Sequence, residues 1–369
     1  MISGSATSEY TASYANRFKT GSHPGHFRKH HDLMFSSIGI GTYLGEMDSE
    51  TDRASDQAMK EALRSGVNVI DSAINYRGQR SERVIGKVIC DLTNEGFDRS
   101  GFFISTKGGF IPFDGNCSEN SSQYFSQTYI KSGILAAKDV VQGCHAMTPQ
   151  YLQDQIDRSL KNLQIEAIDL YYLHNPETQL GEISETDFYK RLTSAFQLFE
   201  KKVEEGKIKM YGAATWNGFR IPSKTRGYLS LAKFLEAAEE AGGKNHHFRA
   251  IQLPYNLGMP EALTTENQDW NGEEISTIEF ARRKEIMVFT SASLLQGRLA
   301  THIPQKIQNL FPNCESMAAC ALQFIRSTPG VLTALVGMKS LEHIHENLAV
   351  KKIAPLSSDD FAHLFVPRS

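Results

Sequence analysis

Short apolar runs alternate with longer amphipathic segments along most of this chain. The runs are rich in β-branched residues and lack a strict apolar–polar alternation, which is typical of strands buried on both faces. The segments between them carry apolar residues at helical spacing, as at Ala58, Met59, Ala62 and Leu63. The pattern therefore predicts β-strands that alternate with α-helices.

Strand–helix units repeat eight times from residue 37 onward. The predicted strands span residues 37–43, 67–71, 101–107, 167–174, 207–215, 249–254, 286–291 and 331–337. The predicted helices span residues 52–66, 80–92, 148–163, 188–206, 228–242, 274–284, 315–328 and 341–349. Eight such units in 369 residues predict an α/β fold, a parallel (β/α)₈ TIM barrel.

Two segments do not fit the repeat. Residues 1–30 are polar and rich in Gly, Ser and His, and we interpret them as an N-terminal arm before a single barrel over residues 31–369. Residues 108–147 form an insertion after the third strand, long for a connection. We expect the insertion to form one wall of a substrate pocket or to reach a neighbouring subunit of a homo-oligomer, since the sequence leaves the oligomeric state undecided. The alternative is a surface segment that packs on the barrel.

Composition narrows the classes of function. With 39 basic and 42 acidic residues, the net charge of −3 argues against nucleic acid as a partner. The chain has no apolar run of about 18 residues, so no membrane span is expected. Five scattered cysteines without a Cys-x-x-Cys pair suit a reduced compartment and predict no metal site. Because the N-terminus also lacks an apolar signal region, we expect a cytoplasmic protein.

In a barrel of this type, functional side chains lie on the loops that follow the strands. The exits of the second, third and fourth strands carry Asp71 and Tyr76, then Lys107, then His174. A phenol is a poor acid at neutral pH, but a nearby cation such as Lys107 lowers its pKa. Asp71 can hold Lys107, and His174 can orient a substrate oxygen. Together they predict a general acid, Tyr76, that protonates a carbonyl oxygen and needs a hydride donor.

The last strand exit offers a place for an anionic group of that donor. Lys339 and Ser340 lie at a predicted helix N-terminus, which favours anions. His343, Glu346 and Asn347 follow on the same helix, within reach of a ribose phosphate and an adenine.

Seven stretches in this order resemble the aldo-keto reductase family, from about Ser36 to Leu348: GIGTY, IDSAINYRGQRSERVIG, FFISTKGG, IDLYYLHNPE, GKIKMYG, IQLPYN and LVGMKSLEHIHENL. The resemblance implies an oxidoreductase that reduces an aldehyde or ketone, or oxidises the corresponding alcohol or sugar. It implies Tyr76 as proton donor with Asp71, Lys107 and His174. The implied cofactor is NADPH, less often NADH, extended across the barrel mouth, and the implied partner is a small carbonyl compound.

The strand exits and the resemblance together supply a set of binding residues. We expect the cofactor to contact Gly41, Thr42, Tyr43, Asn175, Thr215, Gln252, Ser291, Gly337, Lys339, Ser340, His343, Glu346 and Asn347. We expect Tyr43, Trp216 and Arg77 to line the substrate pocket.

Two positions depart from the family pattern. Ala214-Thr215 replaces the usual Ser-Asn that binds the nicotinamide carboxamide, and Thr290 stands where an aromatic residue usually stacks on the ring. These departures keep a second hypothesis open, a cofactor-binding regulatory or redox-sensing barrel with little turnover.

A dinucleotide-binding open sheet is the competing fold, because Gly39 to Gly45 matches a glycine-rich pattern. The predicted helix does not begin at these glycines, and Asp71 lies about 30 residues on rather than about 20. The chain also lacks a Tyr-x-x-x-Lys pair. These features favour the barrel.

Overall fold

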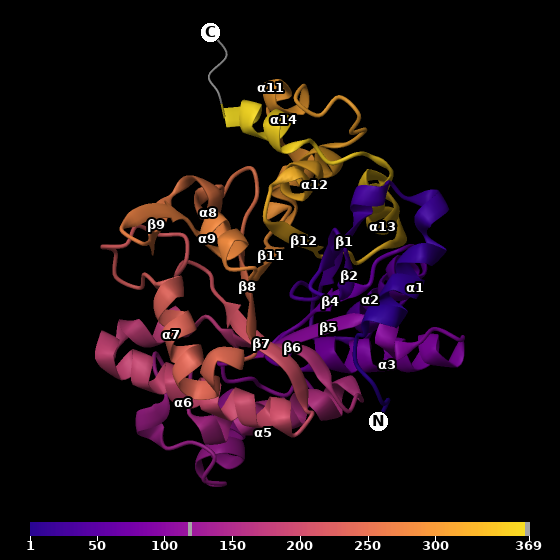
Figure 1. Ribbon diagram of the computed structural model, residues 1–369. Helices are drawn as coiled ribbons and strands as arrows, with labels where there is room; N and C mark the ends of the chain where they lie inside the picture. The colour runs from indigo at the N-terminus through magenta and orange to yellow at the C-terminus, as the bar shows by residue number, and fades with distance from the viewer. Residues whose placement is uncertain (117–119, 366–369) are drawn as a thin grey trace.

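The computed structural model describes residues 1–116 and 120–365, so Cys117 lies outside the described residues. Within them, eight parallel strands close into a barrel in the order β11-β12-β3-β4-β5-β6-β7-β8 (Figure 1). The barrel strands are β3 (Ile38–Gly41), β4 (Val69–Asp71), β5 (Phe103–Gly108), β6 (Ile168–His174), β7 (Ile208–Ala214), β8 (Phe248–Pro254), β11 (Met287–Ser291) and β12 (Val331–Val336). The closed barrel confirms the (β/α)₈ prediction and rules out the open dinucleotide-binding sheet.

Helices cover the outside of the barrel, with α5, α6 and α7 on one side and α2 and α3 on the other (Figure 1). The helices that follow the barrel strands are α2 (Ser49–Arg64), α3 (Arg80–Asn94), α5 (Pro149–Leu163), α6 (Glu185–Glu204), α7 (Leu231–Gly242), α9 (Thr277–Arg283), α12 (Met317–Ser327) and α13 (Leu341–Leu348). Asp48 and Ser230 each accept a hydrogen bond from a backbone N–H three residues on, which fixes where α2 and α7 begin.

Shorter elements decorate the loops. They are α8 (Glu261–Thr264), the hairpin of β9 (Glu266–Trp270) and β10 (Glu273–Ser276), α10 (Arg298–Thr301), α11 (Gln305–Gln308) and α14 (Ser358–Ala362).

Two apolar layers hold the barrel together. One lies between the strands and the surrounding helices. The other fills the barrel interior, where the Phe103 and Phe289 rings stack with centroids 5.9 Å apart and Phe35 packs edge-on against Phe103 at 4.9 Å. Because side chains fill the interior, a ligand can bind at the mouth of the barrel but not inside it.

The polar segment over residues 1–30 is folded against the barrel rather than a separate arm. It contains α1 (Ser8–Arg17), and β1 (Phe27–His30) pairs with β2 (Leu33–Ser36) as an antiparallel hairpin. The Tyr14 hydroxyl lies 2.5 and 2.6 Å from the backbone oxygens of Leu63 and Val67, two acceptors for its single proton. The polar composition of the segment did not indicate this packing, because Tyr14 is one of very few apolar residues that α1 buries.

Most of the insertion over residues 108–147 packs on the side of the barrel. Its helix α4 (Ser121–Phe125) and the turn that follows bring Tyr129 against Tyr151 of α5, with ring centroids 5.8 Å apart. Tyr124 accepts a hydrogen bond from Gln79 at 3.3 Å. Packing on the surface of the barrel therefore describes most of the described part of the insertion, while Phe110, near its beginning, reaches the barrel mouth.

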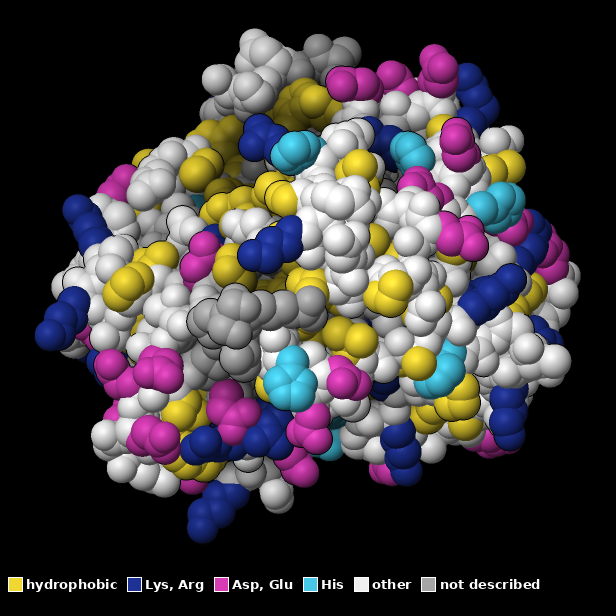
Figure 2. All heavy atoms as spheres, turned by 90° about the horizontal axis from the view of Figure 1, so that it is seen from above, with side chains coloured by type: hydrophobic (Ala, Val, Ile, Leu, Met, Phe, Trp, Pro, Cys, Tyr) yellow, Lys and Arg dark blue, Asp and Glu magenta, His cyan; other side chains and the backbone are white. Residues whose placement is uncertain are grey.

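Basic and acidic side chains are interspersed on the face shown in Figure 2, in keeping with the small net charge. Among the described residues, no helix is long and apolar enough to cross a membrane.

Candidate active site

A buried ion pair lies where β4 and β5 end side by side. The Lys107 Nζ atom is 2.5 Å from Asp71 Oδ2 and also donates to the Ser72 backbone oxygen at 2.6 Å. The other Asp71 oxygen accepts from Ser105 Oγ at 2.7 Å and from Gln252 Nε2 at 2.9 Å. Burial lowers the pKa of Lys107, and the adjacent Asp71 carboxylate opposes that shift. Both ionic groups are therefore fixed by several partners, as a buried ion pair requires.

Tyr76 lies over this ion pair, on the loop that follows β4. Its ring centroid is 4.9 Å from Lys107 Nζ and 5.1 Å from the Tyr43 ring, which meets it edge-on. Burial raises the pKa of Tyr76 well above 10, and the Asp71 carboxylate raises it further. This differs from the expectation that Lys107 lowers the phenol's pKa, because burial outweighs the cation and Asp71 offsets its charge.

His174 ends β6, and its ring meets the Tyr76 ring edge-on with the two centroids 5.8 Å apart. Burial lowers its pKa well below 6.5, and Lys107 adds to that shift. The imidazole is therefore neutral at physiological pH. Its Nδ1 atom is buried without a hydrogen-bond partner among the described residues.

A cavity of about 740 Å³ opens above these side chains at the carboxyl ends of the strands. Its lining brings together most of the residues that the sequence predicted for the site: Gly41, Thr42, Tyr43, Asp71, Tyr76, His174, Asn175, Thr215, Trp216, Gln252, Ser291, Gly337, Lys339, His343, Glu346 and Asn347. Lys107 lies below the lining, under the Tyr76 ring. The volume is within the range of small-molecule and cofactor sites.

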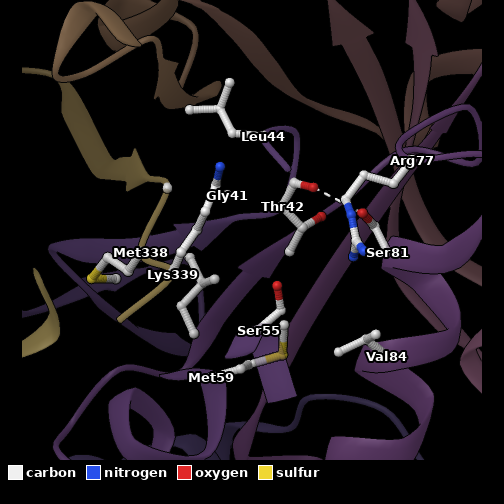
Figure 3. Close-up of a pocket in the computed structure, with 12 residues that line it drawn as sticks. Gly41, Thr42, Leu44, Ser55, Met59, Arg77, Ser81, Val84, Met338 and Lys339 are labelled. Carbon is white, nitrogen blue, oxygen red and sulfur yellow. Dashed lines mark hydrogen bonds between the residues drawn. The ribbon is translucent and has the colours of Figure 1, made fainter. Parts of the chain in front are cut away.

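Arg77 is not part of this lining, contrary to its predicted place in the substrate pocket. Its guanidinium donates to the Glu46 oxygen at 2.8 Å and pairs with Asp52 at 2.6 Å. It lines a separate small pocket of about 20 Å³, where Figure 3 shows it near Ser81 and Thr42. Arg77 therefore ties the loop that carries Tyr43 to the loop that carries Tyr76.

The fold and this constellation are matched by a family model described as "Aldo/keto reductase family", which covers residues 37–231. The chain belongs to the aldo/keto reductase family. The family resemblance noted in the sequence is thereby confirmed.

Solved structures similar to this aldo/keto reductase extend the match over nearly the whole chain. An aldo/keto reductase from Klebsiella pneumoniae, solved with NADP and acetate, is 19% identical with a TM-score of 0.59 and covers 90% of this chain and 91% of its own. The holo form of an aldo-keto reductase from Bacillus halodurans is 18% identical with a TM-score of 0.62, covering 92% and 94%. These likenesses concern the fold.

A curated relative from Schizosaccharomyces pombe carries a different kind of name. It is called "Putative voltage-gated potassium channel subunit beta" and is 25% identical over 361 residues, which are 94% of each chain. This chain is thus similar both to proteins named as reductases and to a protein named as a channel subunit.

The segment that follows β12 forms one part of the cavity wall of this aldo/keto reductase. It contributes Gly337, Lys339 and three residues of α13. His343, Glu346 and Asn347 line the cavity, and Lys339 is exposed at its edge. Ser340 is not in the lining, because its Oγ atom caps α13 by accepting from the His343 backbone N–H at 3.2 Å. Ser340, which the sequence predicted as a cofactor contact, thus forms its hydrogen bond within its own helix.

The loop after β7 is anchored by Glu177, a residue that sequence reasoning missed. One carboxylate oxygen accepts hydrogen bonds from the backbone N–H groups of Trp216, Asn217 and Gly218 at 2.7, 3.0 and 3.3 Å. Burial raises the pKa of Glu177. The anchor holds Trp216 at the cavity, where its side chain is 45% exposed.

The loop after β11 forms another wall that the sequence did not reveal. Ala292 and Gln296 both line the cavity with positive φ angles of 54°. Gly297, with φ of 89°, was the one residue in this wall whose type suits such a backbone. Thr290, the departure from the family pattern, is fully buried and lies outside the cavity lining.

Among the described residues, no group of three or more His, Cys, Asp or Glu side chains is placed to hold a metal ion.

Proposed function

We propose that this aldo/keto reductase is an NADPH-dependent oxidoreductase that reduces an aldehyde or ketone, or oxidises the corresponding alcohol or sugar. One observation carries the proposal. The Tyr76 phenol and the His174 imidazole face one cavity, directly above the buried Lys107–Asp71 pair. This is the arrangement that general acid catalysis at a carbonyl oxygen needs.

The residues present fit NADPH. Thr215 Oγ1 is buried at the cavity without a hydrogen-bond partner among the described residues, so it is available to a ligand. Gly337 has no side chain to obstruct the cavity. Lys339 and His343 supply basic groups where the segment after β12 lines the cavity. The Klebsiella pneumoniae reductase is solved with NADP, and another structure of an aldo-keto reductase from that organism is solved with NADPH. Gln252 is partly committed, since its Nε2 atom already bonds to Asp71.

In the proposed mechanism, bound NADPH would supply the hydride that the carbonyl carbon receives. His174 holds the carbonyl oxygen by a hydrogen bond from its neutral ring. Tyr76 donates its proton to that oxygen as negative charge develops there. Its raised pKa keeps the phenol protonated until then. Lys107, positioned by Asp71 and the Ser72 backbone oxygen, stabilises the charge left on the phenol.

The proposal is tested by following NADPH absorbance with the purified protein and a panel of aldehydes and ketones. We expect NADPH consumption that depends on the carbonyl compound, with the alcohol as product. If NADPH binds but no member of a panel of aliphatic, aromatic and sugar carbonyls accelerates its oxidation, the proposed function is wrong.

A second candidate is a cofactor-binding regulatory barrel with little turnover. It is favoured by the name of the Schizosaccharomyces pombe relative and by Ala214-Thr215, which line the cavity in place of the usual Ser-Asn pair. Tight NADPH binding, slow oxidation with every carbonyl compound and a stable macromolecular partner would together favour this candidate over the first.

A further inference from the structure

The strand exit at His174 leaves a backbone carbonyl for which β5 provides no partner. β5 pairs with β6 up to Gly108 opposite Leu173, and the chain then turns away at Gly109, whose φ is +146°. A Cβ atom at Gly109 would lie 2.7 Å from the His174 oxygen, so the turn needs glycine. Gly108 and Gly109 are the first two residues of the insertion over residues 108–147.

The insertion returns to the exit and supplies the missing donor from His145. The fully buried His145 ring places Nε2 at 2.7 Å from the His174 backbone oxygen. The backbone N–H of Ala146 donates to the Gly109 oxygen at 2.9 Å, so the end of the insertion is tied to its beginning. The side chain of His145 thus occupies the position that a continuing β5 would fill.

The tautomer of His145 is fixed by a chain of partners. Because the His174 oxygen can only accept, Nε2 carries the proton and Nδ1 is the acceptor. Nδ1 accepts from Gln179 Nε2 at 2.9 Å, and the orientation of this amide is set by Arg191, which donates to Gln179 Oε1 at 2.7 Å. Burial lowers the pKa of His145 to about 4, so the ring stays neutral at physiological pH.

We propose that His145 is a positioning residue for the carbonyl reduction, acting through His174. The proposal rests on the function proposed above and gives the insertion a role in it. The Phe110 ring packs edge-on against both imidazoles, at 5.3 Å from His145 and 5.1 Å from His174. His145 and Phe110 together hold the end of β6 and the ring that projects from it into the cavity.

The test compares His145→Ala and His145→Gln with a matched control, His26→Ala. His26 is also fully buried, and its two ring nitrogens likewise contact one side chain and one backbone oxygen, Ser37 Oγ at 3.1 Å and Gly66 O at 2.9 Å. It does not line the cavity. The control therefore reports the general loss of a buried histidine.

Two measurements are made on each full-length protein. The first is steady-state reduction together with the Kd for NADPH. We expect His145→Ala to lower kcat roughly 10- to 100-fold at unchanged Kd, since small displacements of a reacting group have effects of this size. We expect His145→Gln to recover part of the loss and His26→Ala to leave kcat unchanged.

The second measurement does not depend on turnover. In ¹⁵N-histidine NMR spectra, the His174 ring signals, assigned by their loss in His174→Gln, should shift in His145→Ala and stay in place in His26→Ala. Unchanged His174 signals in folded His145→Ala would overturn the proposal. If the parent protein reduces no carbonyl compound, the proposed function fails, while the NMR comparison still decides whether His145 positions His174.

Discussion

At the scale of single residues, the environment of Tyr76 suits its proposed role as a proton donor. Burial and Asp71 raise the phenol's pKa, so the acid form is the resident form throughout the neutral range. Lys107 lies 4.9 Å from the ring centroid, and in the proposed mechanism it contributes most once the proton has left. A half-buried phenol beside a buried ammonium group therefore suits proton donation to an oxygen that becomes negative.

Lys339 supports a prediction about cofactor choice. It is an exposed cation at the cavity edge beside α13, where it can meet a 2′-phosphate. We expect Lys339→Ala to lower the affinity for NADPH relative to NADH about tenfold, equivalent to about 1.4 kcal/mol. Fluorescence titration with both cofactors measures the ratio. Lys352→Ala is the control, since Lys352 lies outside the cavity lining, and an unchanged ratio in Lys339→Ala would refute the role.

At the scale of elements, Gly86 determines how closely α3 approaches α5. A Cβ atom at Gly86 would lie 2.7 Å from the backbone oxygens of Asn162 and Leu163. Alanine is favoured over glycine inside a helix by up to about 1 kcal/mol, but overpacking costs about 1–3 kcal/mol. We expect Gly86→Ala to lower the free energy of unfolding, measured by urea titration.

The control for that prediction is Gly21→Ala. No atom lies within 4 Å of a Cβ built at Gly21, and its φ is not in the positive region. We expect this control to change stability by less than about 0.5 kcal/mol. Equal stability of Gly86→Ala and the parent protein would show that α3 and α5 are not in close contact at this point.

The elements also show what the sequence could predict. Strand exits were predictable because buried parallel strands are continuous apolar runs, and Asp71, Lys107 and His174 follow such runs directly. Helix α1 was not predictable, because its stability comes from contacts with residues far along the chain, such as those of Tyr14 with Leu63 and Val67. Such contacts leave no local pattern.

The residues of the site were likewise predictable only in part. Residues at strand ends were found by position, whereas Glu177, Arg77 and His145 act through backbone groups that lie far along the chain. Arg77 illustrates the difficulty, because its place beside Tyr76 suggested the pocket while its charge is paired with Asp52.

At the scale of the whole molecule, buried neutral histidines such as His26 and His145 predict a loss of stability in acid. Burial lowers the pKa of His26 to about 3 and that of His145 to about 4. In the unfolded chain both rings bind a proton near pH 6.5. Below that value the unfolded state holds more protons than the folded state, so the free energy of unfolding falls as the pH drops.

For His145 the loss reaches roughly 3 kcal/mol by pH 4. Urea unfolding between pH 7 and pH 4 measures the slope, and His145→Gln should make it shallower because one titrating group is removed. A stability that stays constant over this range, or a slope that His145→Gln leaves unchanged, would contradict the buried neutral histidine.

The central claim is that Tyr76 gives the proton to the carbonyl oxygen. The most direct measurement is the single-turnover rate of NADPH oxidation with saturating carbonyl compound, in Tyr76→Phe and in Tyr172→Phe, whose buried ring also lies near Lys107 at 6.0 Å. We predict that Tyr76→Phe lowers the rate at least about 100-fold at unchanged NADPH affinity, while Tyr172→Phe stays close to the parent rate. A Tyr76→Phe rate within a few-fold of the parent would contradict the account.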